Sequence, residues 1–530
     1  MRNFELPGRS PVHATEGMAC TSQPLATQVA IDVLKAGGNA MDAAIAACAT
    51  QCVVEPESTG IGGDCFCLYS PGGSTDIIAY NGSGRAPAAA SVEWFQSQGI
   101  NKLTGTSVHS VIVPGAIDAW AQLSADHGRK SLSELLQPAI RFARDGYPIH
   151  SRVHADFASN AAKLSADENA KRIFMPGGQV PGVGTIHRQP ELAATLERIA
   201  ALGRNEFYKG ETARDIVAYL QARGGLHTLD DFATAAGEYV TPISVDFRGY
   251  RVHECPPNGQ GVIALLLLNI MAGIDIGTGG PITLERMHAE IEAGQLAYSA
   301  RDAWVADPAM AQVPVDGLLS AEYADRLRAA IDPARAQEPD RLIDIPNHKS
   351  TVYISVVDRD RNACSFINTL FNSFGTGICA PTGVMLTNRG EGFSLNPASP
   401  NRIEGGKRPL HTIIPGMVTK GDRAVMPFGV MGGQYQSMGH MQFLTRFFDY
   451  GMDIQEAMDA PRFMPDPFIG NVDVESTVPL AIRDQLTAMG HNITLAPKTI
   501  GGSQAIWIDW DEGVLTGGSD PRKDGCAMGY

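Results

Sequence analysis

Two threonines occupy positions that a β-hairpin would bring face to face. The polar turn 358–362 separates two runs in which apolar and polar residues alternate, so the simplest antiparallel pairing is centred on Asp360. In that register Thr351 lies opposite Thr369, with about 5 Å between their Cβ atoms. One hydroxyl could then orient the other for nucleophilic attack, although paired threonines are also common in ordinary sheets. The hairpin by itself leaves both interpretations open.

The usual catalytic and metal-binding motifs are absent from the sequence, which contains no G-x-S-x-G, Walker A or H-E-x-x-H pattern. His288, Glu290 and Glu292 have side chains that can bind metals, but a spacing of two turns them to different faces of a helix. We therefore interpret this segment as a solvated helix, and we predict neither a metal nor a cofactor.

Composition and charge exclude several classes of protein. Hydrophobic residues make up 44% and charged residues 19% of the 530 residues, which is typical of a folded globular chain. The net charge of −15 would repel nucleic acid. The start of the sequence lacks the apolar stretch of a secretory signal, and the longest apolar run, 262–268, is too short to span a membrane. We expect a cytoplasmic protein with no nucleic-acid or membrane partner.

The nine cysteines show no paired metal-binding pattern. Cys65 and Cys67 flank Phe66 in an alternating stretch, which fits the inner face of a strand better than redox chemistry. We expect the cysteines to be buried free thiols.

The elements that must position these residues mix helices and strands. The first part of the chain is rich in helix, and from about residue 349 β-branched residues recur with a period of two. Helical patterns occupy 25–53, broken at Gly37-Gly38, and then 116–145, 191–224, 284–304, 436–449 and 479–489. Strand patterns occupy 65–69, 76–80, 351–357, 363–370, 384–386 and 491–515. Without an internal repeat or a linker, this order favours one α/β sandwich with layered sheets.

Short motifs follow one another along nearly the whole chain. Before Thr351 they occupy 37–44, 55–63, 113–115, 119–120 and 138–140. From Thr351 onward they occupy 351–358, 369, 374–377, 407–410, 431–433 and 519–525. In this combination and order, the motifs resemble the γ-glutamyltranspeptidase family. The resemblance implies an αββα sandwich and a proenzyme that cuts its own backbone.

The same resemblance places the cut between Ser350 and Thr351, which makes 1–350 a large subunit and 351–530 a small subunit. Thr351 would then carry a free α-amine. Such an amine titrates near roughly 7.7 to 8.0 and can take the proton of the hydroxyl on its own residue. Thr369, by its register and its position in the family, would hold that hydroxyl or amine in place.

Two glycines complete the catalytic set that the resemblance implies. Gly432 and Gly433 would present successive backbone N–H groups to the developing oxyanion, an arrangement that side chains would obstruct. The alternative for these glycines is a tight turn after Met431.

The residues expected to contact the substrate depart from the family pattern. Family enzymes that accept γ-glutamyl groups bind the α-carboxylate with an arginine and serines, and the α-amine with acidic and amide side chains. On this chain the arginine position falls on Ser83, two residues before Arg85, and the other positions fall on Phe371, Arg389, Gly392, His411 and Thr412. Gly392 removes the acid that would pair with a substrate ammonium, and Arg389 adds a positive charge. These two changes predict a pocket for an anion, because an unpaired buried ammonium would be costly.

We therefore expect hydrolysis of a short acidic amide such as oxamate, with Arg85 or Arg389 binding its carboxylate. Arg389 could instead be a surface arginine at the end of a strand. Three other functions stay open: a glutathione or γ-glutamyl hydrolase and transferase, a cephalosporin-type acylase with Phe371 in its apolar lining, and an uncleaved relative that only binds a metabolite. The subunits of one precursor are the expected partners, and processed pairs could dimerise.

Overall fold

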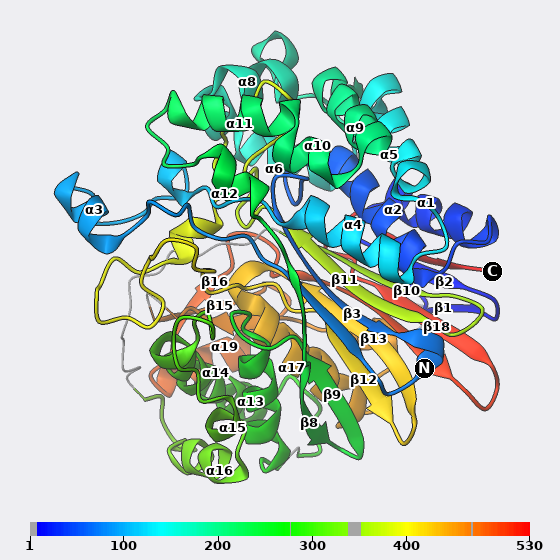
Figure 1. Ribbon diagram of the computed structural model, residues 1–530. Helices are drawn as coiled ribbons and strands as arrows, with labels where there is room; N and C mark the ends of the chain where they lie inside the picture. The colour runs from blue at the N-terminus through cyan, green and yellow to red at the C-terminus, as the bar shows by residue number, and fades with distance from the viewer. Residues whose placement is uncertain (1–7, 276, 338–350, 468–469) are drawn as a thin grey trace.

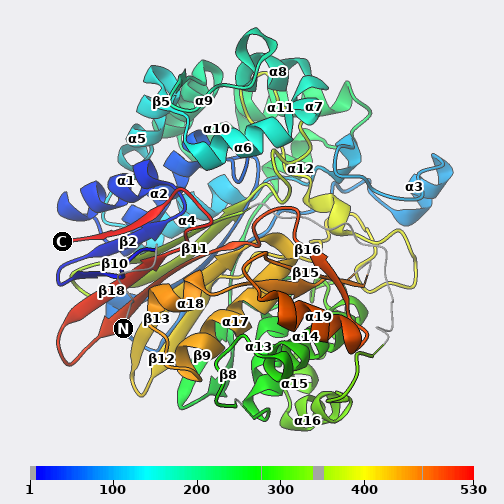
Figure 2. The ribbon, with the colours of Figure 1, turned by 180° about the vertical axis from the view of Figure 1, so that it is seen from behind.

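The computed structural model describes residues 8–275, 277–337, 351–467 and 470–530 (Figure 1). Across these ranges, two seven-stranded sheets are stacked face to face between two layers of helices. The view from behind shows the same four layers (Figure 2). The prediction of an αββα sandwich is therefore confirmed.

One sheet contains the hairpin that follows Thr351. Its strand order is β19 (Cys526–Gly529), β2 (Met18–Thr21), β10 (Val352–Val357), β11 (Ala363–Thr369), β3 (Asp64–Ser70), β4 (Ile78–Gly82) and β7 (Glu238–Val240). The other sheet has the order β1 (Val12–Ala14), β18 (Val514–Ser519), β17 (Gly502–Asp509), β13 (Arg423–Met431), β12 (Gly416–Lys420), β9 (Tyr250–Glu254) and β8 (Ile243–Phe247). Each sheet combines strands from before and after Thr351, so both parts of the chain belong to one body.

Helices cover the outer faces of both sheets. On the side of the β10 sheet lie α1 (Pro24–Lys35), α2 (Ala40–Val54), α4 (Ala116–His127), α5 (Leu132–Asp145), α6 (Ser151–Ser159), α7 (Ala161–Ser165), α8 (Glu168–Phe174), α9 (Pro190–Leu202), α10 (Arg204–Lys209), α11 (Glu211–Gln221) and α12 (Leu229–Ala233), whereas α3 (Val92–Ser97) projects to one side (Figure 1). On the side of the β13 sheet lie α13 (Gly261–Ala272), α14 (Leu284–Trp304), α15 (Val315–Leu318), α16 (Ala321–Ala329), α17 (Gln436–Phe448), α18 (Ile454–Asp459) and α19 (Leu480–Ala488). In the part of the chain that the structure describes, no helix combines the length and apolar character needed to cross a membrane.

Two short sheets lie among these helices. One pairs β5 (Tyr147–Pro148) with β6 (Ile186–His187), and the other has the order β14 (Phe463–Pro465), β15 (Asn471–Val474) and β16 (Asn492–Leu495). The second is relevant to function, because β15 and the segment that follows β16 both contribute to the cavity at Thr351.

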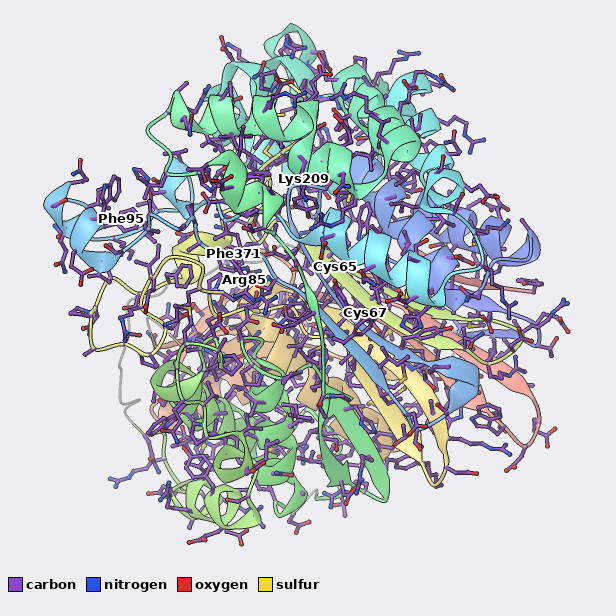
Figure 3. All side chains as sticks on the ribbon, viewed as in Figure 1. Cys65, Cys67, Arg85, Phe95, Lys209 and Phe371 are labelled. Carbon is purple, nitrogen blue, oxygen red and sulfur yellow. The ribbon has the colours of Figure 1, made fainter. Side chains whose placement is uncertain are left out.

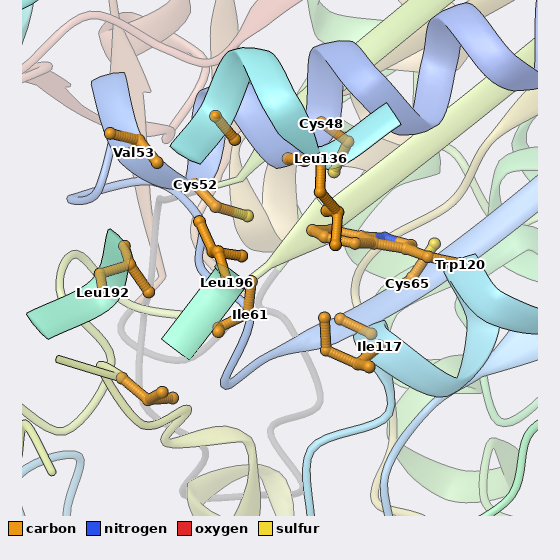
Figure 4. Packing of buried hydrophobic residues seen from close by; sticks show 14 of the residues in the cluster. Cys48, Cys52, Val53, Ile61, Cys65, Ile117, Trp120, Leu136, Leu192 and Leu196 are labelled. Carbon is orange, nitrogen blue, oxygen red and sulfur yellow. The ribbon is translucent and has the colours of Figure 1, made fainter. Parts of the chain in front are cut away.

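Buried apolar clusters fill the interfaces between the layers. α2 starts at a capping box formed by Asn39 and Asp42, and every one of its residues is buried against the β10 sheet and neighbouring helices. Within the same cluster, Figure 4 shows Trp120 of α4 packed beside Leu136 of α5. The space between the two sheets is filled by side chains such as Phe66. Each fully buried large apolar side chain contributes about 1.5 to 3 kcal/mol, so burial holds the layers together.

The register predicted for the hairpin is confirmed. Val352 pairs with Asn368 and Val357 pairs with Ala363, which centres the turn on Asp360. β10 lies between β11 and β2, and all of its residues are buried. This central position fixes where the chain enters the strand, and therefore where Thr351 lies.

Two predicted helical stretches are divided in the structure. The 116–145 stretch forms α4 and α5, because a capping box at Ser131 starts a new helix. The 191–224 stretch forms α9, α10 and α11, which are separated at Gly203 and Gly210. The stretches 25–53 and 284–304 form helices as predicted, the first as α1 and α2 and the second as α14.

The predicted strand at 384–386 is wrong. Met385 and Leu386 form only isolated bridges, to Cys379 and Gly62. The apolar residues at these positions are buried, but isolated bridges rather than a continuous ladder connect them to their neighbours.

The cysteines are free thiols, of which eight are buried and Cys526 is half-buried. Cys65 and Cys67 lie on β3 near the middle of the molecule (Figure 3) and face the cluster under the helices. Burial raises the pKa of both thiols, so they stay protonated and pack as small apolar groups. The expectation of buried free thiols is confirmed for these residues.

Candidate active site

The hydroxyl oxygens of Thr351 and Thr369 lie 3.3 Å apart. Thr351 immediately precedes β10 and Thr369 ends β11, so the pairing register alone brings the two side chains together. The N–H of Phe371 donates to Thr369 Oγ1 over 2.8 Å. Because that oxygen accepts a backbone proton, its own hydroxyl proton can be directed at Thr351 Oγ1. Ser350 lies outside the described residues.

Gly62 and Gly63 allow close backbone contacts with Met385 and Thr369. Asp64 at the start of β3 pairs with Thr369. A Cβ on Gly63 would lie 2.0 Å from the carbonyl oxygen of Thr369, and a Cβ on Gly62 would lie 2.2 Å from that of Met385. Only glycine permits contacts this close, so this part of the 55–63 motif has a packing reason.

Gly432 and Gly433 form the turn between β13 and α17. Their φ angles are +135° and +59°, which lie in the region that favours glycine. A Cβ on Gly432 would lie 2.9 Å from the Cα of Gly501. The amide of Gln260 donates to the carbonyl oxygen of Gly433 over 3.1 Å. The turn is thus constrained by sterics on one side and by a buried hydrogen bond on the other.

Gln436 is a polar residue at Thr351 that sequence reasoning missed. Its Nε2 lies 3.5 Å from Thr351 Oγ1, and its Oε1 accepts the N–H of Ile414 over 3.0 Å. The second contact fixes which end of the amide faces the threonine. No motif could have indicated this residue, because the contact joins a helix start to a position 85 residues away. The one sequence feature that could have indicated Gln436 is its position shortly after the Gly432-Gly433 turn.

Thr351 and Gly432 line a cavity of about 510 Å³, a volume suited to a small molecule. The remaining lining is mostly polar, and its charged members are Arg152, Lys163, Lys498 and Lys523 together with Asp156, Glu391 and Asp473. Arg152 is already paired with Asp156 over 2.7 Å. The wall therefore offers both cationic and acidic groups to a ligand.

Lys163 is a second residue that the sequence did not single out. Its Nζ donates to the carbonyl oxygens of Ser373 and Gly375 over 2.8 and 3.2 Å. Burial lowers the pKa of Lys163 to about 8. The ammonium is thus charged at pH 7 and can attract an anion, but it loses its charge at mildly alkaline pH.

Arg389 is fully buried, not a surface arginine. Its Nη1 donates to Thr412 Oγ1 over 3.1 Å, while Nε and Nη2 have no hydrogen-bond partner among the described residues. The guanidinium carbon lies 3.7 Å from the ring centre of Phe371, whose φ of +78° is rare for a large side chain. Burial lowers the pKa of Arg389 to about 9. A buried cation with two unsatisfied donors is costly unless an anion completes it.

His411 and Thr412 surround Arg389 rather than the cavity. His411 Nε2 lies 2.9 Å from Asp64 Oδ2. Burial and the nearby Arg389 guanidinium lower the pKa of His411 to about 4, against the opposing effect of Asp64. The imidazole is therefore neutral at pH 7, and the Asp64 contact ties it to the start of β3.

Arg85 is engaged by other groups. Its Nη1 donates to the carbonyl oxygen of Gly406 over 3.0 Å, and its guanidinium lies 3.7 Å from Asp307 and 3.9 Å from Glu238. Figure 3 labels Arg85 close to Phe371 in projection, yet neither Arg85 nor Arg389 is among the described residues that line the cavity. The structure brings Arg389, not Arg85, next to the Phe371 ring.

The expectation of a pocket without an acid is wrong. Gly392 replaces the expected aspartate, but the preceding residue, Glu391, lines the cavity. Its Oε2 accepts the amide protons of Asn372 and Asn388 over 2.9 and 3.2 Å. Glu391 and Gly392 both lie in a short 3-10 turn over Arg389–Gly392, so the acid is one residue before the position reached by residue counting.

The interpretation of 288–292 as a solvated helix is also wrong. His288, Glu290 and Glu292 are all buried on α14. His288 and Glu292 are four residues apart, so they share a face of the helix, and they meet His491 there.

Two stacked antiparallel sheets between helical layers, with a threonine at the head of a central strand, define the N-terminal-nucleophile hydrolase class of fold. The family model for Gamma-glutamyltranspeptidase matches residues 26–530. The chain belongs to the γ-glutamyltranspeptidase family and is an enzyme of that family.

Similar proteins carry several printed activities. The chain is 36% identical to the glutathione hydrolase-like YwrD proenzyme of Bacillus subtilis (strain 168), over 98% of this chain and 99% of the relative. It is 32% identical to the oxamate amidohydrolase proenzyme of Klebsiella pneumoniae, over 98% and 99% of the two chains. The crystal structure of cephalosporin acylase from Bacillus halodurans superposes with a TM-score of 0.93 at 40% identity, covering 100% of this chain and 99% of that one.

Proposed function

We propose that the chain cuts itself between Ser350 and Thr351 and then uses Thr351 to hydrolyse a short acidic amide. In the cut, the Thr351 hydroxyl oxygen attacks the carbonyl carbon of Ser350, and the acyl group moves from nitrogen to oxygen. Water then hydrolyses the ester, which leaves a carboxylate on Ser350 and a free α-amine on Thr351. The two products are 1–350 and 351–530. The word proenzyme in the relatives' names supports this step.

In turnover, the α-amine of Thr351 takes the proton of the hydroxyl, and Oγ1 attacks the amide carbonyl of the substrate. The backbone N–H groups of Gly432 and Gly433 stabilise the oxyanion. The tetrahedral intermediate collapses with transfer of the proton to the departing nitrogen, and water hydrolyses the resulting acyl-threonine. Thr369 and Gln436 hold the Thr351 hydroxyl, as their contacts of 3.3 and 3.5 Å suggest.

The observation that carries the substrate assignment is the pair of unpartnered nitrogens on buried Arg389. A carboxylate that displaces the Phe371 ring would complete this guanidinium with two charge-assisted hydrogen bonds. Only one residue separates Phe371 from the nucleophile, because the N–H of Phe371 donates to Thr369 Oγ1, and Thr369 contacts Thr351. Lys163 in the cavity wall adds a second positive charge. Oxamate has a carboxylate next to its amide, so it satisfies this arrangement, and a relative from Klebsiella pneumoniae is named for that substrate.

A γ-glutamyl hydrolase and transferase is the second candidate, and one observation favours it. Glu391 lines the cavity beside Asn372, and this pair could bind the α-ammonium of a glutamyl group. The name of the Bacillus subtilis relative agrees with this activity. A cephalosporin-type acylase is the third candidate, supported by the printed title of the 40% identical structure.

A substrate panel with pocket variants separates these candidates. Ammonia release from oxamate, p-nitroaniline release from γ-glutamyl-p-nitroanilide and acid release from an acylated cephalosporin are compared on one preparation. We expect oxamate turnover, with its KM raised about 10- to 100-fold in Arg389→Leu, the loss typical of hydrogen bonds to a charged group. Arg85→Leu is the matched control and should leave KM unchanged. Turnover of the anilide alone, abolished by Glu391→Gln, would reverse the ranking.

Two further predictions concern the processed protein as a whole. We propose that the processed pairs can dimerise and that the enzyme acts in the cytoplasm. Sedimentation of the cleaved protein and fractionation of the source cells test them.

A further inference from the structure

A cluster of three metal-binding side chains lies in the helical layer below the β13 sheet. His288 and Glu292 project from one face of α14, and His491 lies in the connection between α19 and β16. His288 Nδ1 is 2.8 Å from His491 Nε2, and His491 Nε2 is 3.9 Å from Glu292 Oε1. One ligand atom from each side chain fits within 4.8 Å of the others. At most 4% of any of the three residues is exposed.

The hydrogen bonds of His288 determine which of its nitrogens is available. His288 Nε2 lies 2.8 Å from the carbonyl oxygen of Asp332. A carbonyl can only accept, so Nε2 carries the proton and Nδ1 presents its lone pair towards His491. A histidine whose second nitrogen donates to a backbone carbonyl is the usual arrangement at protein metal sites.

The carboxylate is held in the same way. The N–H of Gln337 approaches Glu292 Oε1 at 3.4 Å, and the same oxygen is the one that lies 3.9 Å from His491 Nε2. The segment that supplies these backbone groups, 332–337, is partly exposed, whereas the three side chains beneath it are buried. A cation could therefore enter under this segment.

We propose that His288, Glu292 and His491 form a binding site for a divalent transition metal, with Zn²⁺ as the best match to two imidazoles and one carboxylate. Tetrahedral zinc with bonds of about 2.0 to 2.1 Å separates two nitrogen ligands by about 3.3 Å. The imidazoles need only move apart by roughly half an ångström from their present spacing, and water can complete the fourth position.

The site is structural and separate from the amide chemistry. None of its three members is among the described residues that line the Thr351 cavity. Its ligands come from α14 and from the connection between α19 and β16, and its supporting backbone comes from 332–337. Bound metal would join three segments that are distant in sequence, so it should stabilise the folded chain rather than change the rate of hydrolysis.

Metal binding is tested on full-length protein treated with a chelator and then titrated with Zn²⁺ or Co²⁺. We expect one tightly bound ion per chain, a rise in Tm, and visible cobalt bands without the near-ultraviolet band of a cobalt–thiolate bond. His491→Gln and Glu292→Gln should each weaken binding at least tenfold and abolish the rise in Tm.

The matched control is His227→Gln, which replaces another buried histidine that also contacts a backbone carbonyl, at 3.1 Å from Val111 O. This variant should bind the metal as the unmodified chain does, whatever its own stability. The alternative is a simple hydrogen bond in which His491 donates to His288. Absence of stoichiometric binding, or equal binding by His491→Gln, would establish that alternative and overturn the metal site.

Discussion

Thr351 and Thr369 face each other across the ends of β10 and β11, with their hydroxyl oxygens 3.3 Å apart and both side chains buried. The contact places one hydroxyl at the cavity and the other behind it, where a backbone N–H from Phe371 holds it. Every catalytic role proposed above depends on this geometry.

Thr351→Ala should remain a single polypeptide without hydrolytic activity, because alanine has no oxygen to attack the preceding carbonyl. Unmodified protein should give two pieces on a denaturing gel, and mass spectrometry should find Thr351 at the start of the shorter one. Thr351→Ser keeps a hydroxyl and should still be cut, though more slowly. An unbroken unmodified chain after long incubation would favour a relative that only binds a metabolite.

Thr369→Val should lower kcat by about 10- to 100-fold with little change in KM, because valine keeps the shape of threonine but removes the hydroxyl that orients Thr351. Single-turnover kinetics separates the acylation step from product release. Thr195→Val is the matched control: its buried hydroxyl donates to the carbonyl oxygen of Thr382 over 2.8 Å and accepts from Arg198 Nη2 over 3.1 Å, and Thr195 is not among the described residues that line the cavity. Equal losses in both variants would show a general packing effect.

The hairpin could be predicted from sequence because it is local. Alternating residues on both sides of a polar turn determine the register, and the register determines that Thr351 meets Thr369. The order of layers could also be expected, since the motifs that carry the resemblance extend along nearly the whole chain. The ends of the helices were harder to predict from sequence. The capping at Ser131 and the break at Gly203 depend on single residues inside otherwise continuous helical patterns.

The pocket could not be predicted, because its walls come from segments that meet only in the folded protein. Glu391 lines the cavity from a 3-10 turn, one residue before the position reached by residue counting, and Lys163 reaches the cavity from a helix about 190 residues before the nucleophile. The burial of Arg389 under Phe371 depends on a backbone conformation that sequence patterns do not indicate. The same reason explains the error at Glu292, whose partner His491 lies far along the chain.

Gly432→Ala should lower kcat by about 100- to 1,000-fold, the loss typical of one missing oxyanion donor. The added Cβ would lie 2.9 Å from the Cα of Gly501, so the turn must shift and its N–H groups move away from the oxyanion. Gly37→Ala is the control, because it also imposes a side chain at a positive φ, +86°, but meets no atom within 4 Å. The control should lose stability in thermal unfolding and keep its kcat, whereas retention of activity by Gly432→Ala would remove this turn from the mechanism.

The KM for an anionic amide should rise as the pH increases through about 8. Burial lowers the pKa of Lys163 to that value, so the ammonium that attracts the substrate is charged below it and neutral above it. The α-amine of Thr351 titrates in the same range with the opposite consequence, because it acts as a base only when unprotonated, so kcat should rise while KM also rises. Lys163→Met should give a high KM at every pH, and Lys163→Arg should keep the low KM into the alkaline range. A neutral amide with the same leaving group is the control, and a KM for the anion that stays constant from pH 7 to about 9.5 would exclude Lys163 from substrate binding.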